Sequence, residues 1–481
     1  FKKNCFLFGS EIKTIISSQI QNFTINQLSL ENTAIFWTNI SDSCSIKNIK
    51  VLEPGCYLRI RNNKISTTRY FTNPILIKKN YNSSLNKVDF IEKFQNAIKN
   101  QIHGEVGHAC YLSGGIDSAA LAFFLNKYTK KKLDTFSIEF SNKEYDESSK
   151  QKFFSKFLKT NHRSIKVDKI DIANNFEKVV SHAETFLFRT APVPLYLLSK
   201  FVKKFNHKVV FTGEGADEVL FGYDIFFENR IRQFWRKNKK SKIRPLLFKK
   251  LYNYLPQFNN DRYFGISKDF YKKFLINHKS IYFSHLVRWS QYDQISKYFN
   301  FSRDQKTIIK DYISSTDRKL GKLSKDRSAQ FFEFDTLLAN YLLSSQGDRM
   351  SLANSIEGRY PFLDEDFTDY CSKVDSKYLA LGIKSKSFFR NSLKEFIPSN
   401  KIIYQPKVAY QAPEAKSFLD HNFISIQAEE FLDNLNKLDL IHKKNFDGLI
   451  KKIRNRFTSD RLGFRENMSF ILGISYYYLQ K

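Results

Sequence analysis

The feature that most constrains the fold is a polar, glycine-containing turn between two apolar segments. "HACYL" (residues 108–112) has the pattern of a short buried strand, and "AALAFFL" (119–125) is apolar on nearly every face, as a buried helix is. Between them lies "SGGIDS" (113–118). A turn that leads from a strand into a helix presents unpaired backbone N–H groups and the positive end of the helix dipole. We therefore predict a binding site for an anion such as phosphate.

The segments that follow alternate between strand and helix patterns. Further strands are predicted at 134–140, 163–168 and 208–213. Such alternation predicts a parallel α/β sheet whose ligands bind at the carboxyl ends of the strands. Beyond about residue 224 the pattern is mostly helical, with a clear amphipathic helix at 386–398. The fold class is therefore predicted as α/β, with a parallel nucleotide-binding sheet and a helical C-terminal part.

The first 75 residues have a different pattern, typical of short strands and turns. Strands are predicted within 5–13, 33–40 and 51–66. Pro54–Gly55 is expected to form a turn. A polar stretch then leads into an amphipathic helix at 88–102, so we predict a domain boundary near residue 80. The predicted domains are 1–80 and 81–481.

The formal charge of +30 is characteristic of nucleic-acid-binding proteins, but lysine is abundant along the whole chain. Only 234–250 concentrates the charge, which one amphipathic basic surface helix would explain. A nucleic-acid-binding protein built on an inactive nucleotide fold stays as an alternative, and steep salt dependence of binding would reveal it. No run of 18 apolar residues predicts a membrane span. Five scattered cysteines favour reduced thiols in the cytoplasm and no His or Cys metal site.

The glycine turn differs from the common phosphate loop because no Gly-Lys-Ser/Thr follows it. It resembles the PP-loop of ATP pyrophosphatases, which hold the β,γ-pyrophosphate while a nucleophile attacks the α-phosphorus. That chemistry requires close backbone approach at Gly114 and Gly115, hydroxyl donors at Ser113 and Ser118, and a carboxylate for magnesium at Asp117. An ordinary tight turn is the alternative interpretation.

Three further clusters carry candidate residues. "FTGEGADEVLFGY" (211–223) follows a strand, and its Asp217 would join Asp117 on Mg²⁺ while Glu214 faces the reacting centre. A solvated acidic turn is the alternative. In 344–370, charged residues alternate with small ones. Arg349 and Arg359 could serve the site, but structural ion pairs explain them equally well. In "IIYQPKVAYQAP" (402–413), Lys407 follows an amphipathic helix and could by itself be a solvated charge.

The motifs, in their order, resemble those of one enzyme family. "SGGIDS", "TFSIEF", "YDES", "GEGADEVLFGY", "SIEGRYPFLD" and "QPKVAYQAP" are similar to the synthetase domain of glutamine-hydrolysing asparagine synthetases. "FLFGSEIKTI" and "VLEPGCYLRI" resemble the last part of that family's β-rich, Ntn-type class II glutaminase domain. The resemblance implies a truncated glutaminase remnant with a linker at 1–80, and an asparagine synthetase (PP-loop) domain at 81–481.

The resemblance also implies an ATP site built from this chain's residues. Backbone around Leu112 and Ile138 would border adenosine, as would Gly213, with Thr212 beside it in the same ATP-binding set. Asp117 and Asp217 would together bind the magnesium of Mg-ATP.

The implied reaction amidates aspartate. Glu214 would support formation of β-aspartyl-AMP, and Lys407 would neutralise charge on the α-phosphate. Ammonia, derived from glutamine in the full-length enzyme, would then give asparagine and AMP. The implied substrates are aspartate, ATP, and ammonia or glutamine, and a homodimer is left open. No specific nucleic acid or membrane partner and a cytoplasmic location are expected.

Two departures from the family pattern affect the details. The family's glutaminase nucleophile is an N-terminal cysteine, and Cys5 does not match it, so we expect this chain to use ammonia but not glutamine. The chain starts at Phe1 without Met, so we also expect it to begin mid-protein. Gln405 stands where family members often carry Arg.

The carboxylate that accepts the nitrogen stays open: a relative could amidate a sugar acid or a peptide intermediate, or close a β-lactam ring. Ring-closing relatives use a Tyr–Glu pair, whereas Glu214 suits the aspartate-activating type.

Overall fold

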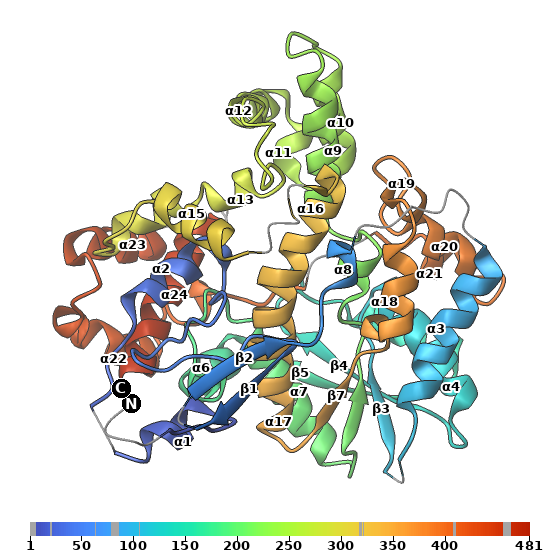
Figure 1. Cartoon of the computed structure of the whole chain (residues 1–481), viewed down its shortest axis with the longest axis horizontal. Coiled ribbons are helices and arrows are strands. Elements are labelled where there is room, and N and C mark those ends of the chain that lie inside the picture. The colour runs from blue at the N-terminus through green and yellow to red at the C-terminus, as the bar shows by residue number, and fades with distance from the viewer. Residues whose placement is uncertain are drawn as a thin grey trace.

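A five-stranded parallel sheet forms the centre of the protein (Figure 1). The computed structural model describes residues 6–19, 22–62, 64–77, 86–104, 106–316, 320, 322–406, 410–455 and 463–481. The strand order is β5-β4-β3-β6-β7. The strands are β3 (His108–Tyr111), β4 (Asp134–Phe140), β5 (Asn161–Val167), β6 (Val209–Phe211) and β7 (Glu357–Arg359). The predicted parallel α/β fold is confirmed, and β7 is a fifth strand that the sequence pattern did not predict.

Helices cover both faces of this sheet, as in a doubly wound fold. One face packs against α3, α4 and α5, whose Phe94, Phe124 and Phe154 belong to one hydrophobic core. The other face packs against α6 and α7, whose Phe176 and Val193 belong to a second core. The bounds are α3 (Lys87–Gln101), α4 (Ile116–Tyr128), α5 (Ser148–Leu158), α6 (Lys169–Ala183) and α7 (Pro192–Lys203).

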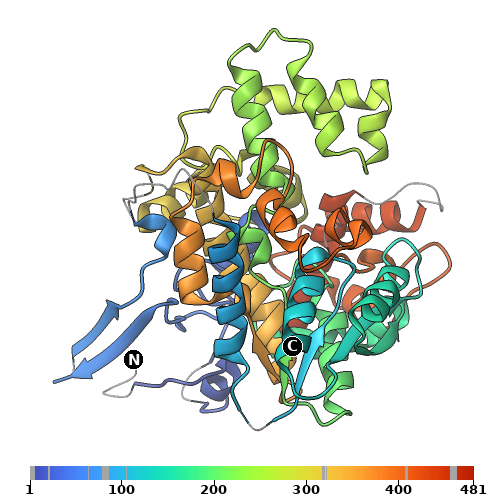
Figure 2. The same ribbon diagram turned by 90° about the vertical axis from the view of Figure 1, so that its right-hand side faces the viewer.

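A helical arm projects from the body above the carboxyl edge of the sheet (Figures 1 and 2). It comprises α9 (Asp224–Arg236), α10 (Leu247–Leu251), α11 (Pro256–Asn259) and α12 (Asp261–Lys273). The single basic helix predicted at 234–250 is wrong, because α9 ends at Arg236 and a turn precedes α10. The hydroxyl of Ser241 accepts the N–H groups of Ile243 and Arg244 at 3.3 and 3.1 Å. Such local side-chain bonds favour a turn over a helix, and the lysines before it offer no apolar side to bury.

A long helix crosses the middle of the molecule. Helix α16 (Lys325–Phe332) continues as a π-helix at Glu333–Asp348 and then as α17 (Arg349–Leu352). Side chains follow the wider turn: Asn340 donates to the carbonyl five residues earlier, that of Asp335, at 3.1 Å. Such helices are rare and are concentrated at functional sites.

The remaining helices are mostly short. Along the chain, one comes after β6 and the others come after the arm or after β7. They are α8 (Ala216–Val219), α13 (Leu286–Trp289), α14 (Tyr292–Ile295), α15 (Gln305–Ser315), α18 (Glu365–Ser372), α19 (Ser376–Leu379), α20 (Ser387–Leu393), α21 (Asn400–Ile403), α22 (Ile426–Asp433), α23 (Lys443–Asn455) and α24 (Phe464–Gln480). The predicted helical C-terminal part is thus confirmed. Among the described residues, no helix is both long and apolar enough to cross a bilayer.

The N-terminal segment contains helices where strands were predicted. In place of the strands within 5–13 and 33–40, the structure has an irregular stretch leading into α1 (Ile12–Ile16), and α2 (Gln27–Phe36). Helix α2 forms because the Asn26 side chain caps it at the N–H of Leu28 and because most of its length is buried. A short apolar run such as "TAIF" fits either element until its burial is known.

The third predicted strand segment is confirmed. After a turn at Pro54–Gly55, β1 (Cys56–Arg61) pairs antiparallel with β2 (Lys64–Arg69). This hairpin stands out from the body in Figure 2. The predicted boundary near residue 80 lies within 78–85, outside the described residues, so the division into two domains stays a prediction.

Candidate active site at the carboxyl edge of the sheet

The candidate site lies where the strand order changes direction. From β3 the chain adds β4 and then β5 on one side, and β6 and β7 on the other. In open α/β sheets, ligands bind in the crevice that forms at such a point, outside the carboxyl ends of the strands. The loops after β3 and β6 flank this point and lead into α4 and α8. The first turns of these helices carry Asp117 and Asp217, which the sequence predicted to share a metal ion.

The two aspartates meet on one buried lysine. The ammonium of Lys386 lies 2.5 Å from Oδ2 of Asp117 and 2.6 Å from Oδ1 of Asp217. Lys386 is 1% exposed, although Lys is rarely buried without a partner. It directly precedes α20 and has a left-handed backbone (φ 50°), which costs on the order of 1 kcal/mol. Sequence reasoning missed this residue, because its only local signal was a lysine before an amphipathic helix.

Glycine is required where the second loop passes the lysine. A Cβ added at Gly222 would overlap both the Asp217 carboxylate and the Lys386 side chain. The backbone N–H of Gly222 donates to the carbonyl of Asp217 at 2.8 Å and closes the turn. The glycine of "LFGY" therefore has a role in letting the ion-pair cluster close.

The predicted PP-loop is held by its own hydroxyl groups. The hydroxyls of Ser113 and Ser118 lie 2.9 Å apart, and the Ser118 hydroxyl also accepts the N–H of Ser113 at 3.1 Å. The N–H of Gly115 donates to the Ser113 hydroxyl at 3.2 Å, and that of Gly114 to the carboxylate of Glu147 at 3.3 Å. Gly115 caps α4, so the loop leads into a helix N-terminus as predicted.

The residues predicted to border adenosine lie in or just after neighbouring strands. Leu112 follows β3 and donates its N–H to the carbonyl of Phe136 on β4 at 2.9 Å. Ile138, further along β4, is buried. Thr212 and Gly213 follow β6, and Thr212 donates its N–H to the carbonyl of Arg359 on β7 at 3.0 Å.

The acidic turn after β6 contains carboxyl groups in different electrostatic environments. Glu214 is half-buried, and its N–H donates to the Thr212 hydroxyl at 3.2 Å. Glu218 is 1% exposed. Burial, with the nearby charges of Asp217 and Glu214, raises the pKa of Glu218 well above its usual range, against a hydrogen bond from Tyr223 that lowers it. The protonated form of Glu218 is therefore favoured more than that of an exposed glutamate.

A tyrosine–aspartate pair lies beside this turn. The Tyr360 hydroxyl donates to Oδ1 of Asp348 at 2.6 Å. Burial raises the pKa of Tyr360, and the charges of Asp348 and Glu214 raise it further. A Cβ at Gly358 would overlap the Tyr360 hydroxyl, so that glycine leaves the phenol its space. Sequence reasoning did not single out this pair.

The two arginines of the predicted cluster at 344–370 form structural ion pairs. Arg349 pairs with Glu184, which also accepts the N–H groups of Ile12 and Lys13 at 2.8 Å each. Arg359 pairs with Glu357 at 2.8 Å and also donates to the carbonyl of His103, beyond the end of α3, at 2.8 Å. Both arginines therefore hold segments of the fold together.

Lys407, predicted to be catalytic together with Glu214, lies outside the described residues, and its role stays a prediction. Gln405 just before it is described, and its carbonyl accepts a hydrogen bond from Arg390 at 3.1 Å. Burial lowers the pKa of Arg390, against the opposing effect of Asp117 and Asp217. Arg390 thus adds a second cation within electrostatic reach of the two aspartates.

The carboxylate pair fits a magnesium ion that is shared with a phosphate ligand. Oδ1 of Asp117 is buried and accepts no hydrogen bond from the described residues. Within the same residues, no group of three or more His, Cys, Asp or Glu side chains forms a metal site of protein ligands alone. Mg²⁺ needs only one or two carboxylates when substrate phosphates supply other oxygens. Asp117 and Asp217 match that requirement.

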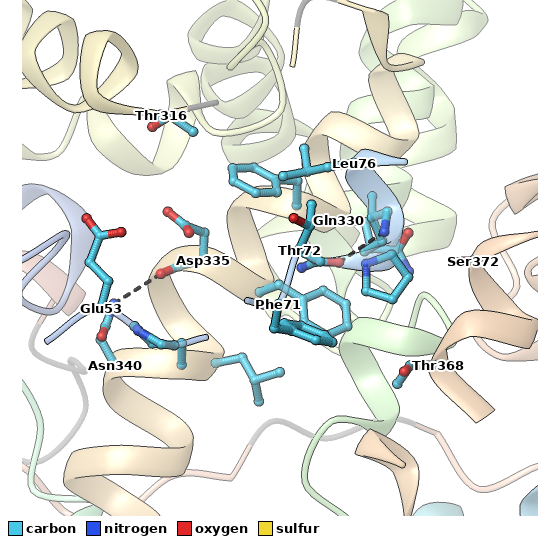
Figure 3. A pocket seen from close by; sticks show the side chains of 18 of the residues that line it. Glu53, Phe71, Thr72, Leu76, Thr316, Gln330, Asp335, Asn340, Thr368 and Ser372 are labelled. Atoms are coloured by element: carbon cyan, nitrogen blue, oxygen red, sulfur yellow. Dashed lines mark hydrogen bonds between the residues drawn. The ribbon is translucent and has the colours of Figure 1, made fainter. Parts of the chain in front are cut away.

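A cavity of about 620 Å³ lies between the segment around Phe71 and the π-helix that carries Asp335 (Figure 3). The segment around Phe71 and Thr72, the π-helix with Asp335, and α18 line it. Leu363 lines it as well, and the same side chain packs so closely on Gly215 (φ 87°) that a Cβ there would overlap it. One leucine therefore separates the cavity from the Glu214–Gly215 turn.

Comparison with known proteins places the chain in one family. The family model described as asparagine synthase matches residues 89–475. The glutamine-hydrolyzing asparagine synthetase 1 of Bacillus subtilis is 24% identical over 84% of this chain and 62% of its own length. Amidase chry2 of Gibberella zeae is 25% identical over 67% of this chain and 51% of its own. Asparagine synthetase 3 of Bacillus subtilis is 22% identical over 84% and 61%.

The chain thus spans about half to three-fifths of the length of these curated relatives. A solved U34-tRNA thiolase, NcsA from Methanococcus maripaludis, aligns with 47% of this chain and 79% of its own at 16% identity, but its TM-score of 0.23 is too low to carry an argument. The family model, in contrast, covers most of the chain and includes every motif from the glycine turn to "QPKVAYQAP". The chain belongs to the asparagine synthase family.

Proposed function

We propose that this chain catalyses the ATP-dependent amidation of aspartate to asparagine through β-aspartyl-AMP. The observation that carries the proposal is the meeting of Asp117 and Asp217 on the buried Lys386 at the switch point of the sheet. Membership in the asparagine synthase family supports the reaction class. Two carboxylates and a cation between a glycine turn and an acidic turn suit a bound nucleoside triphosphate.

In the proposed reaction, a β-carboxylate oxygen of aspartate attacks the α-phosphorus of ATP, and pyrophosphate leaves. Ammonia then attacks the acyl carbon, AMP leaves, and the nitrogen loses a proton. Activation is needed because a carboxylate resists attack by an amine, whereas AMP is a good leaving group. A site that excludes water protects the acyl-adenylate from hydrolysis.

Each group in the site has a role under this proposal. The N-terminus of α4 and the loop from Ser113 to Ser118 would bind the pyrophosphate portion. Asp117 and Asp217 would hold Mg²⁺, which supplies charge neutralisation to the phosphates. Lys386 would then turn its ammonium from the carboxylates toward the phosphate oxygens. Glu214 would face the aspartate, and Lys407 would serve the α-phosphate.

The first prediction concerns the bond that is broken. We expect AMP and pyrophosphate as products, because the loop lacks the lysine that phosphate loops direct at the β- and γ-phosphates. Separation of the nucleotides after turnover with aspartate and ammonia tests this. ADP as the main product would contradict the proposed mechanism, and reactions without aspartate provide the control.

The second prediction concerns the route of the nitrogen donor. The cavity ends one side chain away from the Glu214–Gly215 turn, so we propose that ammonia enters through it. Ala339 lines the cavity, and Ala339→Phe should raise the KM for ammonia roughly tenfold, about 1.4 kcal/mol, by filling it. Exchange of pyrophosphate into ATP, which needs no ammonia, should stay unchanged. Ala339→Ser, which keeps the volume, is the control, and an unchanged KM in the Phe variant would contradict the route.

A second acceptor remains a candidate because of one observation. The Tyr360–Asp348 pair resembles the Tyr–Glu pair of the relatives that close a β-lactam ring, although its acid is Asp. In addition, one similar protein is named an amidase and not an asparagine synthetase. Incubation of the chain with ATP, ammonia and a panel of carboxylic acids, with products identified by mass, decides between the acceptors. Amidation of another acid in preference to aspartate would replace the first proposal.

A further inference from the structure

The projecting arm carries a disproportionate share of the charge of the protein. Between Arg236 and Lys279 the chain has thirteen Lys and Arg against two Asp, a net charge of +11 out of +30 for 481 residues. An even distribution would assign this stretch less than a tenth of the total. Uniform lysine richness, which the sequence analysis favoured, therefore does not explain the arm.

The interior of the arm is aromatic and is continuous with the hydrophobic core that covers the α3–α4–α5 face of the sheet. Phe248 stacks on Tyr271 with ring centroids 4.3 Å apart, and Tyr252 lies 4.7 Å from Phe258. The hydroxyls of Tyr252 and Tyr271 donate to the buried carboxylate of Glu228 at 2.9 and 3.1 Å. The large apolar side chains that are exposed on the arm lie outside this core.

Its base is anchored to the body by a buried cation. Arg232 is fully buried and donates to the carbonyls of Phe283 and Ser284 at 2.8 Å each. Figures 1 and 2 both show the rest of the arm extending away from the sheet and its covering helices. A surface on this arm can therefore meet a partner without blocking the carboxyl edge of the sheet.

Large apolar side chains are exposed among the basic residues. Ile243, between Lys242 and Arg244, is 77% exposed, and Ile266 on α12 is 64% exposed. Arg244 lies over the ring of Phe234, 4.3 Å from its centroid, so the end of α9 and the following turn form one surface. Leu246, Tyr254, Tyr263 and Ile276 are exposed as well.

We propose that this arm docks the protein onto an anionic lipid membrane surface. Clusters of lysine and arginine are attracted to acidic headgroups, and exposed aliphatic side chains gain by entering the boundary between headgroups and acyl chains. Nucleic acid would use the same charges for its phosphates, but it offers stacked bases, on which aromatic side chains pack, and no hydrocarbon for isoleucine or leucine. The aliphatic residues thus favour the membrane.

Co-sedimentation with vesicles tests the inference. The chain should bind vesicles of phosphatidylcholine that contain phosphatidylserine and should not bind phosphatidylcholine alone. A triple variant should weaken binding roughly 10²-fold or more, because each lysine near the surface contributes about fivefold to the affinity. The variant combines Lys239→Glu, Lys240→Glu and Lys242→Glu. Ile243→Ser with Leu246→Ser should weaken it several-fold and make the remaining binding fully sensitive to salt.

A matched control separates this surface from overall charge. Lys443→Glu, Lys444→Glu and Lys451→Glu change three exposed lysines on α23 and should leave vesicle binding within about twofold of the unchanged chain. Equal loss in both triple variants, or no binding to the anionic vesicles, would overturn the inference. Tighter binding to double-stranded DNA than to vesicles, unaffected by the Ile243 and Leu246 changes, would overturn it in favour of nucleic acid.

Discussion

Replacement of Lys386 by methionine is expected to reduce aspartate-dependent exchange of labelled pyrophosphate into ATP by about 10²–10³. The ammonium lies between two carboxylates at 2.5 and 2.6 Å, and in the proposed reaction it serves the phosphates. Loss of one well-placed charge in an enclosed site typically has an effect of this size. The exchange assay isolates adenylation because it needs no nitrogen donor.

The same variant should respond to magnesium more strongly than the unchanged chain. Without Lys386, Asp117 and Asp217 lose the cation that contacts both of them, and removal of one partner from a buried ion pair typically costs about 3–5 kcal/mol. If the pair binds Mg²⁺, the metal should raise the Tm of Lys386→Met more than that of the unchanged chain. Equal responses would contradict the assignment of the pair to magnesium.

Lys386→Arg provides a variant that keeps the charge. It should retain more stability than the methionine variant, but it should recover little exchange activity. A planar guanidinium does not replace a compact ammonium in a space bounded by two carboxylates and the backbone of Gly222. Near-normal exchange in both Lys386 variants would mean that the lysine only neutralises the aspartates.

Glu214→Gln is expected to reduce the same exchange by about 10²–10³ while leaving ATP binding and the Tm nearly unchanged. The substitution preserves the shape of the side chain and removes its charge. That charge raises the pKa of Glu218, Tyr341 and Tyr360, so Glu214 contributes to a negative potential at the centre of the site. The ammonium group of aspartate would be drawn to this potential.

The neighbouring glutamate is a matched control. Glu218→Gln keeps the shape of this buried side chain, and the amide oxygen can still accept the hydrogen bond from Tyr223. Burial already raises the pKa of Glu218 above its usual range, which opposes its negative charge. We expect near-normal exchange in this variant. A loss equal to that of Glu214→Gln would indicate that both substitutions disturb the fold of the turn, and the role given to Glu214 would be wrong.

The sequence was sufficient wherever local pattern decides structure. The strands at β3 and β4, the glycine turn and the buried helix α4 follow from apolar patterning and turn residues. Helix/strand alternation then predicted a parallel sheet, because parallel strands need crossover connections. The local pattern gave the wrong element at α2, where a strand was predicted. Burial of most of that segment stabilises a helix, and burial is a property of the tertiary structure.

The sequence by itself also determined the two acidic candidates of the site, because the carboxyl ends of parallel strands meet at one edge. Only the tertiary structure decided what lies between them: Lys386 is 269 positions from Asp117, and no local pattern marks it as buried. The same holds for Glu218, whose pKa is raised by burial and by charges brought near it in the fold. Burial and long-range pairing depend on which segments pack together, whereas strand, turn and helix signals depend on near neighbours in the chain.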